Sequence, residues 1–165
     1  RGTVVDVGTG SGAIALALAA EGAFDRVIAV DVSPDALAVA RANLVAIPED
    51  RRARVEFREG SLLAPIAGEK VEVVVRNPPY ISPAEARELP ALVHAWEPHL
   101  ALFAEDDGMA VIRALVPEAA SVLVPGGLLA LEVDSRRADL AAAAVSADGR
   151  FTDVEQRLDL TGRPR

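Results

Sequence analysis

The sequence contains no cysteine, which excludes disulfide bonds, thiolate metal sites and cysteine nucleophiles. It has only two histidines, His94 and His99, and two such side chains alone make a poor metal site, so we expect no bound metal. Apolar runs stop short of the length that spans a membrane. The first residues also lack the basic start and apolar segment of a signal peptide, so we predict a cytoplasmic protein without membrane association.

Basic residues are also scarce, because 17 lysines and arginines stand against 25 acids and give a net charge of −8. Surfaces that bind nucleic acid normally carry a basic excess, so this charge argues against DNA or RNA as the main partner. The 165 residues, of which 51% are hydrophobic, fit one domain with its own core, and we expect a monomer. Because the chain starts at Arg1 without a methionine and its first residues already resemble a strand, we interpret it as part of a longer protein.

Short apolar runs alternate with helical patterns along the chain. We expect strands at residues 3–7, 26–30, 54–58, 71–75, 128–133 and 151–158. We expect helices at residues 11–20, 34–46, 108–123 and 136–145, a turn at Pro125-Gly126-Gly127, and a long loop at residues 77–105, which holds five prolines. This alternation predicts an α/β fold with a doubly wound, mostly parallel, Rossmann-like sheet, whose ligands bind at the carboxyl ends of the strands.

A glycine-rich turn, Gly8-Thr9-Gly10-Ser11-Gly12, directly follows the first expected strand. Glycines let the backbone turn tightly and let a ligand approach closely, and the N–H groups at the start of the following helix can receive an anion. Asp31 ends the second expected strand, where a carboxylate can accept hydrogen bonds from ribose hydroxyls. Dinucleotide sites place the third glycine one position later, so this spacing favours a nucleoside that carries an amino acid over a nicotinamide cofactor.

A second motif, Asn77-Pro78-Pro79-Tyr80, follows the fourth expected strand. The two prolines fix the backbone and remove two donors, so the exposed groups are the Asn77 amide, the Pro78 carbonyl and the Tyr80 ring. Two acceptors can receive hydrogen bonds from both N–H groups of an amide or aromatic amine and so direct its nitrogen lone pair at a methyl donor. Tyr80 can pack on the planar group. The motif therefore predicts N-methyl transfer.

With these motifs in this order, the chain resembles the release-factor glutamine methyltransferases, the HemK or PrmC family. The resemblance extends through Glu97-Pro98 and Pro125-Gly126-Gly127 to the closing Asp159-Leu160-Thr161-Gly162-Arg163. It implies a class I S-adenosylmethionine methyltransferase fold and a catalytic domain over residues 1–165. It also implies that Asn77 and Pro78 hold the glutamine amide with Tyr80 beside it, so that these three are the catalytic residues. The substrate-binding residues are then Asn77, Pro78, Pro79 and Tyr80. The residues that it places on S-adenosylmethionine are Gly8, Thr9, Gly10, Ser11, Gly12, Asp31, Ser61, Leu62 and Asn77.

The family's substrate is the glutamine of the Gly-Gly-Gln loop of peptide chain release factors, so the resemblance implies such a factor as partner and S-adenosylhomocysteine as product. Two alternatives remain within enzymes: a nucleic-acid amino-methyltransferase, which would place a flipped base in the same pocket, and a diverged paralogue with another protein substrate. A cofactor-binding module without catalysis is the alternative outside enzymes, although the intact Asn77–Tyr80 motif speaks against it.

Several positions depart from the family's pattern. Ser61 stands where an Asp usually accepts the adenine amino group, and it is a weaker, uncharged acceptor. Leu62 stands where some members place a Trp, and Arg76 where a small residue is usual. Trp96, Asp134 and Arg137 differ as well. These changes bear on the substrate more than on the type of reaction, and Arg76 either lines the cofactor or substrate channel or points to solvent.

The resemblance also concerns what lies beyond the two ends of the sequence. The family carries an N-terminal helical domain that helps to dock the substrate, and this chain shows none. The family's last strand, which runs antiparallel between the fifth and sixth strands, begins where this chain stops at Arg165. We expect the loss of that strand to leave strand edges exposed and stability low.

Overall fold

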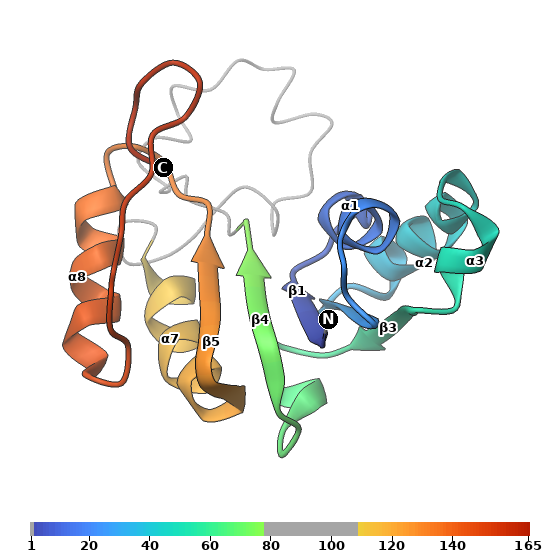
Figure 1. Cartoon of the computed structure of the whole chain (residues 1–165), viewed down its shortest axis with the longest axis horizontal. Helices are drawn as coiled ribbons and strands as arrows, with labels where there is room; N and C mark the ends of the chain where they lie inside the picture. Colours follow the sequence, from blue (N-terminus) through green and yellow to red (C-terminus); the bar gives the residue numbers. More distant parts are fainter. Residues whose placement is uncertain (1, 78–108) are drawn as a thin grey trace. The chain divides into compact units, whose positions relative to one another are not determined.

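A computed structural model describes residues 2–77 and 109–165 of the chain (Figure 1). Five strands form one sheet in the order β3-β2-β1-β4-β5. They are β1 (Thr3–Val7), β2 (Arg26–Asp31), β3 (Val55–Glu59), β4 (Val71–Arg76) and β5 (Leu123–Leu131). The pairs β1–β2, β2–β3 and β1–β4 are parallel. The chain thus builds outward from β1 to β3 and then crosses to β4 on the other side of β1, which confirms the predicted doubly wound sheet.

The helices of the described residues begin and end close to the predicted positions. They are α1 (Ala13–Glu21), α2 (Pro34–Asn43), α3 (Glu49–Arg52), α7 (Ala110–Val122) and α8 (Ala138–Asp148), with short 3-10 turns η1 (Leu44–Ala46) and η2 (Ala64–Ile66). The Ser33 hydroxyl caps α2 by accepting a hydrogen bond of 3.2 Å from Ala36 N, as the Ser-Pro pair at its start predicts. The short helix α3 was not predicted.

Two predictions about strands are wrong. Pro125-Gly126-Gly127 is not a turn between helix and strand but part of β5, because Gly126 adopts a φ of 79° that lets an irregular strand continue. Residues 151–158 form no strand in the part of the chain that the structure describes, where Leu158 makes only an isolated bridge to Pro164. Apolar residues in this segment do not alternate, and a strand needs a neighbour with which to form its hydrogen bonds.

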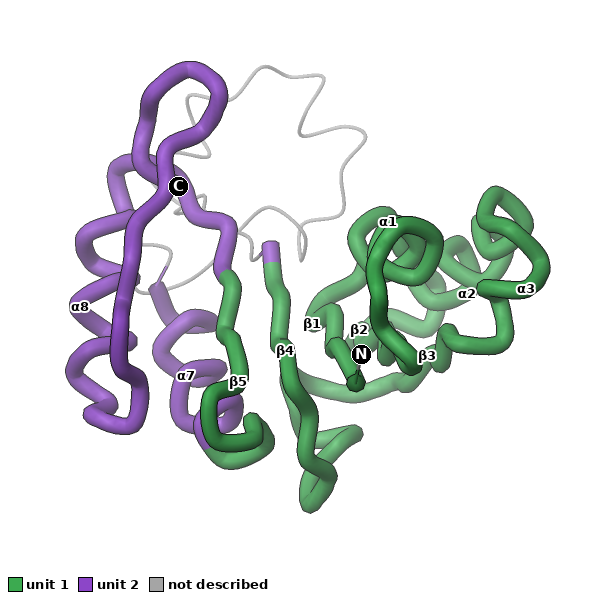
Figure 2. Tube along the Cα trace, in the orientation of Figure 1, with its two compact units in different colours: residues 1–76, 121–130 green, residues 77–120, 131–165 purple. Residues whose placement is uncertain are grey.

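The chain divides into two compact units (Figure 2), the first formed by residues 1–76 and 121–130 and the second by residues 77–120 and 131–165. In the first unit, α1 packs on one face of the sheet through Ala15, Leu16 and Ala19, which meet Val4 and Val27. Val55 and Phe57 of β3 pack against this cluster from the same side, as their alternation in the sequence predicts. This packing fixes where α1 begins, and hence the shape of the turn between β1 and α1.

The second unit is described by itself. It holds most of α7, all of α8, and a closing turn in which one Asp159 carboxylate oxygen accepts hydrogen bonds from Thr161 N, Thr161 Oγ1 and Arg163 N at 2.8, 2.7 and 3.0 Å. These bonds, with that from Arg163 leading, lower the pKa of Asp159 to about 2. The Asp-Leu-Thr-Gly-Arg ending therefore has a local structural reason. No helix among the described residues has both the length and the apolar character needed to cross a membrane.

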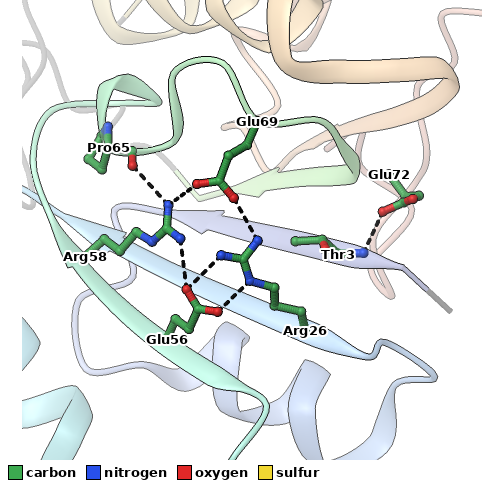
Figure 3. A network of polar contacts seen from close by, with 7 residues as sticks. All are labelled: Thr3, Arg26, Glu56, Arg58, Pro65, Glu69 and Glu72. Atoms are coloured by element: carbon green, nitrogen blue, oxygen red, sulfur yellow. Dashed lines mark hydrogen bonds and ion pairs between the residues drawn. The ribbon is translucent and has the colours of Figure 1, made fainter.

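The face of β3 opposite Phe57 carries a network of ion pairs (Figure 3). Arg26 contacts Glu56 at 2.5 Å and Glu69 at 2.7 Å. Arg58 contacts Glu56 at 2.9 Å and also pairs with Glu69. The hydrogen bond from Arg26 is the main reason why the pKa of Glu56 is lowered to about 2. The four side chains therefore join β2, β3 and the segment before β4.

We expect this network to make the fold sensitive to acid. A carboxylate whose pKa falls on folding stabilises the protein above its ordinary pKa of 4.5, and this contribution is lost as the pH drops towards 2. The loss of unfolding free energy between about pH 6 and about pH 3, measured by urea denaturation, is expected to be smaller in Glu56→Gln than in the parent. Glu21→Gln is the control, because Glu21 is exposed and has no ion pair within residues 2–77 and 109–165. An identical pH dependence in Glu56→Gln and the parent would contradict the prediction.

Candidate functional site

The candidate site lies at the carboxyl ends of the strands, where the strand order reverses. β1 is paired with β2 on one side and with β4 on the other, so the residues that follow these strands border one edge of the sheet. The glycine turn follows β1, Asp31 ends β2, and Ser61 lies just beyond β3. Crevices at such switch points are the usual ligand sites of doubly wound sheets. Within the first unit, the structure therefore places the glycine turn, Asp31 and Ser61 at the same end of the strands.

The glycine turn is fixed by hydrogen bonds to the neighbouring strand. Gly8 N and Thr9 N both donate to Val30 O, at 2.7 and 2.9 Å. Gly8, Gly10 and Gly12 have φ values of 72°, 55° and 84°, a left-handed conformation that glycine adopts without strain. Gly8 and Ser11 are exposed. Among the described residues, no protein acceptor receives the N–H of Ser11, so this donor remains available to a ligand.

Asp31 holds the turn in place as well as standing at the end of β2. One carboxylate oxygen accepts a hydrogen bond of 2.8 Å from Gly10 N, and the other accepts one of 2.9 Å from Ser33 N. Its backbone carbonyl accepts a hydrogen bond of 2.9 Å from Gly60 N. Each carboxylate oxygen has two lone pairs, so one acceptor position remains on each. The carboxylate can therefore still receive two hydroxyl groups from a ligand.

Asp6 is a structural acid that the motif analysis did not assign. Its side chain is 1% exposed, and one oxygen accepts hydrogen bonds from Thr9 Oγ1 at 2.6 Å and Ala15 N at 3.1 Å. Burial raises the pKa of this carboxyl, while the hydrogen bonds and the charge of Arg76 act in the opposite direction. Asp6 thus joins β1, the turn and α1. An acid inside an apolar strand requires such donors, which was the available signal in the sequence.

Arg76 points at the glycine turn and not to solvent. A Cβ atom built on Gly8 would lie 3.0 Å from Arg76 Nη1 and 3.3 Å from its Cζ, so the guanidinium lies directly against Gly8. Burial lowers the pKa of Arg76, and the charges of Asp31 and Asp6 oppose this effect. Within the part of the chain that the structure describes, Arg76 Nε is buried without a hydrogen-bond partner. The position of this side chain resolves the question that the sequence left open.

The segment after β3 is shaped by two unusual backbone conformations. Gly60 has a φ of 153°, and a Cβ there would collide with the Pro65 ring. Leu62 has a φ of 48°, which is rare for a residue with a branched side chain. Ser61 is exposed, and its carbonyl accepts a hydrogen bond of 3.1 Å from Ala64 N. Such strain clusters at functional sites, which is consistent with a ligand contact at Ser61 and Leu62.

The predicted substrate-binding motif is described only at its first residue. Asn77 is exposed and directly follows β4. The other predicted residues lie outside the described part of the chain, and they are Pro78, Pro79, Tyr80, His94, Trp96, Glu97, Pro98 and His99. Within residues 2–77 and 109–165, no group of three or more acidic or histidine side chains is placed to hold a metal ion.

Asp134 and Arg137, which depart from the family's pattern, lie in the second unit. Asp134 accepts hydrogen bonds from Arg136 N at 2.9 Å and Arg136 Nε at 2.7 Å, which lower its pKa. Arg137 Nη1 lies 3.9 Å from the same carboxylate. Glu132 pairs with Arg165 at 3.1 Å. These contacts assign local structural roles to the acids that follow β5.

Comparison with known proteins supports the resemblance seen in the motifs. The sequence profile of the methyltransferase small domain family matches residues 1–95. A release factor glutamine methyltransferase from Deinococcus radiodurans is 47% identical over 163 residues, which cover 98% of this chain and 55% of the relative. Another from Moorella thermoacetica is 44% identical over 163 residues, which cover 99% of this chain and 56% of the relative. The chain thus spans about half the length of the curated relatives it matches.

The fold is also found among solved structures. The ribosomal protein L11 methylase of Lactobacillus delbrueckii superposes with a TM-score of 0.66 at 23% identity, covering 99% of this chain and 67% of that one. At this identity the likeness concerns the fold alone. It confirms the prediction of a Rossmann-like methyltransferase fold.

Proposed function

Because the chain belongs to the methyltransferase small domain family, we propose that residues 1–165 form the catalytic domain of an S-adenosylmethionine-dependent N-methyltransferase. The acceptor is the side-chain amide nitrogen of a protein glutamine. The observation that carries this proposal is the pairing of β1 with β4: the glycine turn follows the first strand, and Asn77 with its Pro-Pro-Tyr sequence follows the second. Cofactor and amide ligands thus come from two adjacent strands of one sheet edge.

The residues around the turn fit a nucleoside that carries an amino acid. Gly10 has no heavy atom within 4 Å of the position where a Cβ would stand, so a ligand has room to approach its backbone. Asp31 keeps two free acceptor positions for ribose hydroxyls. We assign contacts with S-adenosylmethionine to the turn, Asp31, Ser61, Leu62 and Asn77. When bound, this cofactor supplies an electrophilic methyl group on its sulfonium and leaves as S-adenosylhomocysteine.

The residues of the Asn77 motif orient the acceptor nitrogen. The Asn77 side-chain oxygen and the Pro78 carbonyl accept hydrogen bonds from the two N–H groups of the glutamine amide. The nitrogen lone pair of this amide is otherwise delocalised into the glutamine carbonyl. Both acceptors stabilise the positive charge that develops on nitrogen during attack. Tyr80 packs on the planar amide. The charged nitrogen is acidic and loses its proton readily, so no strong base is required.

For the substrate, we propose the Gly-Gly-Gln glutamine of a peptide chain release factor. Support comes from the two relatives, both named release factor glutamine methyltransferase, which match nearly the whole chain. Such a partner places the protein in the cytoplasm. The negative charge of −8 favours a protein acceptor over a nucleic acid.

A methyl-transfer assay tests this proposal. Full-length protein is incubated with labelled S-adenosylmethionine and a release factor, and the control factor has its Gly-Gly-Gln glutamine changed to glutamate. We expect label on the unmodified factor and none on the control. Cofactor binding without label on the factor would overturn the release-factor assignment, and transfer to adenine or cytosine of a nucleic acid would replace it by the amino-methyltransferase alternative.

A further inference from the structure

Arg76 brings a cation to a glycine turn at a position that the motifs do not explain. Arg76 follows Val75, which is paired with Asp6 in the β1–β4 register, so its side chain starts beside the end of β1. From there the guanidinium reaches the Gly8 backbone, where any side chain at position 8 would meet Nη1 at 3.0 Å. The glycine at position 8 therefore makes room for this guanidinium as well as for the turn.

At least one hydrogen-bond donor of the Arg76 guanidinium has no acceptor among the described residues. Within the described residues, Arg76 Nε is buried without an acceptor, and Arg76 forms no hydrogen bond with Asp6 or Asp31, which act on it through their charge alone. Both acids are close enough to act on its charge, but their oxygens already receive the hydroxyl of Thr9 and backbone N–H groups. Arg76 is half-buried, and its buried Nε lacks a partner among the described residues, which is costly, so a carboxylate ligand there gains more than it would in water.

The neighbourhood of Arg76 matches the amino-acid part of the proposed cofactor. That part is a zwitterion, with one carboxylate and one ammonium group close together. The glycine turn offers one guanidinium beside Gly8 as a partner for the carboxylate. The N–H of Ser11, which has no protein acceptor among the described residues, adds a further donor to the same turn. An adenosine without this tail would still meet Asp31 through its ribose, but it would make no use of the charge of Arg76.

We propose that Arg76 binds the carboxylate of the amino-acid tail of the cofactor and so selects for cofactors that retain this group. The inference rests on the proposed function, because it takes S-adenosylmethionine as the ligand. It adds a specificity-determining residue at a position where the resembled family usually has a small side chain. A role as a mere counter-charge for Asp6 and Asp31 is the alternative that an experiment has to separate.

Two ligands that differ only in the carboxylate distinguish carboxylate binding by Arg76 from a counter-charge role. The binding of S-adenosylmethionine and of decarboxylated S-adenosylmethionine is measured by titration calorimetry with full-length protein and with Arg76→Ser. We expect the variant to bind S-adenosylmethionine about tenfold or more weakly, as the loss of a charge-assisted hydrogen bond implies, and the decarboxylated ligand within about twofold of the parent. Arg51→Ser on α3 is the matched control for the loss of one positive charge, and it is expected to change neither affinity.

Equal weakening of both ligands in Arg76→Ser would overturn the inference in favour of a structural role, and so would unchanged binding of S-adenosylmethionine. A parent protein that binds neither ligand would overturn the proposed function as well, so the two failures are distinguishable. Thermal unfolding without ligand checks that Arg76→Ser is folded. If it is not, Arg76→Lys serves in its place, for which we expect a smaller loss that is still confined to the ligand with the carboxylate.

Discussion

Replacing Asn77 by Ala is expected to lower kcat for methyl transfer by about two to three orders of magnitude, because it removes one of the two acceptors that hold the amide nitrogen in the transition state. The interaction strengthens as positive charge develops on nitrogen, so the loss falls on kcat more than on the cofactor Kd. Asn77 is exposed after β4, so the stability of the fold is expected to change little. Single-turnover transfer of labelled methyl and separate cofactor titration measure the two effects.

The conservative variant Asn77→Asp is the matched control for this experiment. It keeps a side-chain oxygen that accepts a hydrogen bond from an N–H group at the same position, so we expect it to retain a higher kcat than Asn77→Ala. If the two variants lose activity equally, the acceptor role assigned to Asn77 is wrong. An active Asn77→Ala enzyme would show that other residues hold the substrate amide, although the assignment of a methyltransferase fold would stand.

The second large effect is expected at Gly12, where the turn enters α1. Gly12 has a φ of 84°, and a Cβ there would lie 3.1 Å from Ala40 Cβ and 3.3 Å from Leu16 Cδ1. Gly12→Ala therefore adds the cost of a left-handed backbone to the cost of overpacking between α1 and α2. Together these are expected to lower the unfolding free energy by about 3 kcal/mol, which urea denaturation measures.

Gly10→Ala separates the two costs, because Gly10 shares the left-handed conformation, with a φ of 55°, but has open space where a Cβ would stand. We expect it to lose about 1 kcal/mol of stability from the backbone alone. The added methyl group occupies the space proposed for the cofactor, so S-adenosylmethionine binding is expected to fall more than stability does. Equal losses of stability in the two variants would show that the contact with Ala40 is unimportant.

The parts of the fold that the sequence predicts well are those governed by local signals. β1, β2 and β4 are mostly apolar runs, and α2 starts at a Ser-Pro pair, so their positions follow from short stretches of chain. The start of β5 and the strand at residues 151–158 were predicted wrongly, because pairing with other strands decides them. Pairing beside β4 draws a Pro-Gly-Gly sequence into a strand, and the segment at 151–158 has no partner strand among the described residues.

In the candidate site, too, local sequence patterns predict some features, while contacts between distant segments decide others. The glycine turn and Asp31 were predicted as cofactor ligands from their spacing, and the structure places them together through the bond from Gly10 N to Asp31. That bond joins residues 21 positions apart, so its existence does not follow from local pattern. The direction of Arg76 depends on the register of β4 beside β1, which the sequence does not specify. Whether the glycine turn, Asp31, Ser61, Leu62 and Asn77 contact the cofactor stays a prediction.

The hydrogen bonds of Asp31 also limit how this site can evolve. A substitution at Asp31 simultaneously releases Gly10 N and Ser33 N, so any new ligand preference there is acquired together with a damaged turn. The exposed side chain of Ser61 makes no hydrogen bond in the described part of the protein, so it can change without that cost. We therefore expect lineages of this family to diverge at Ser61 sooner than at the acid that ends β2.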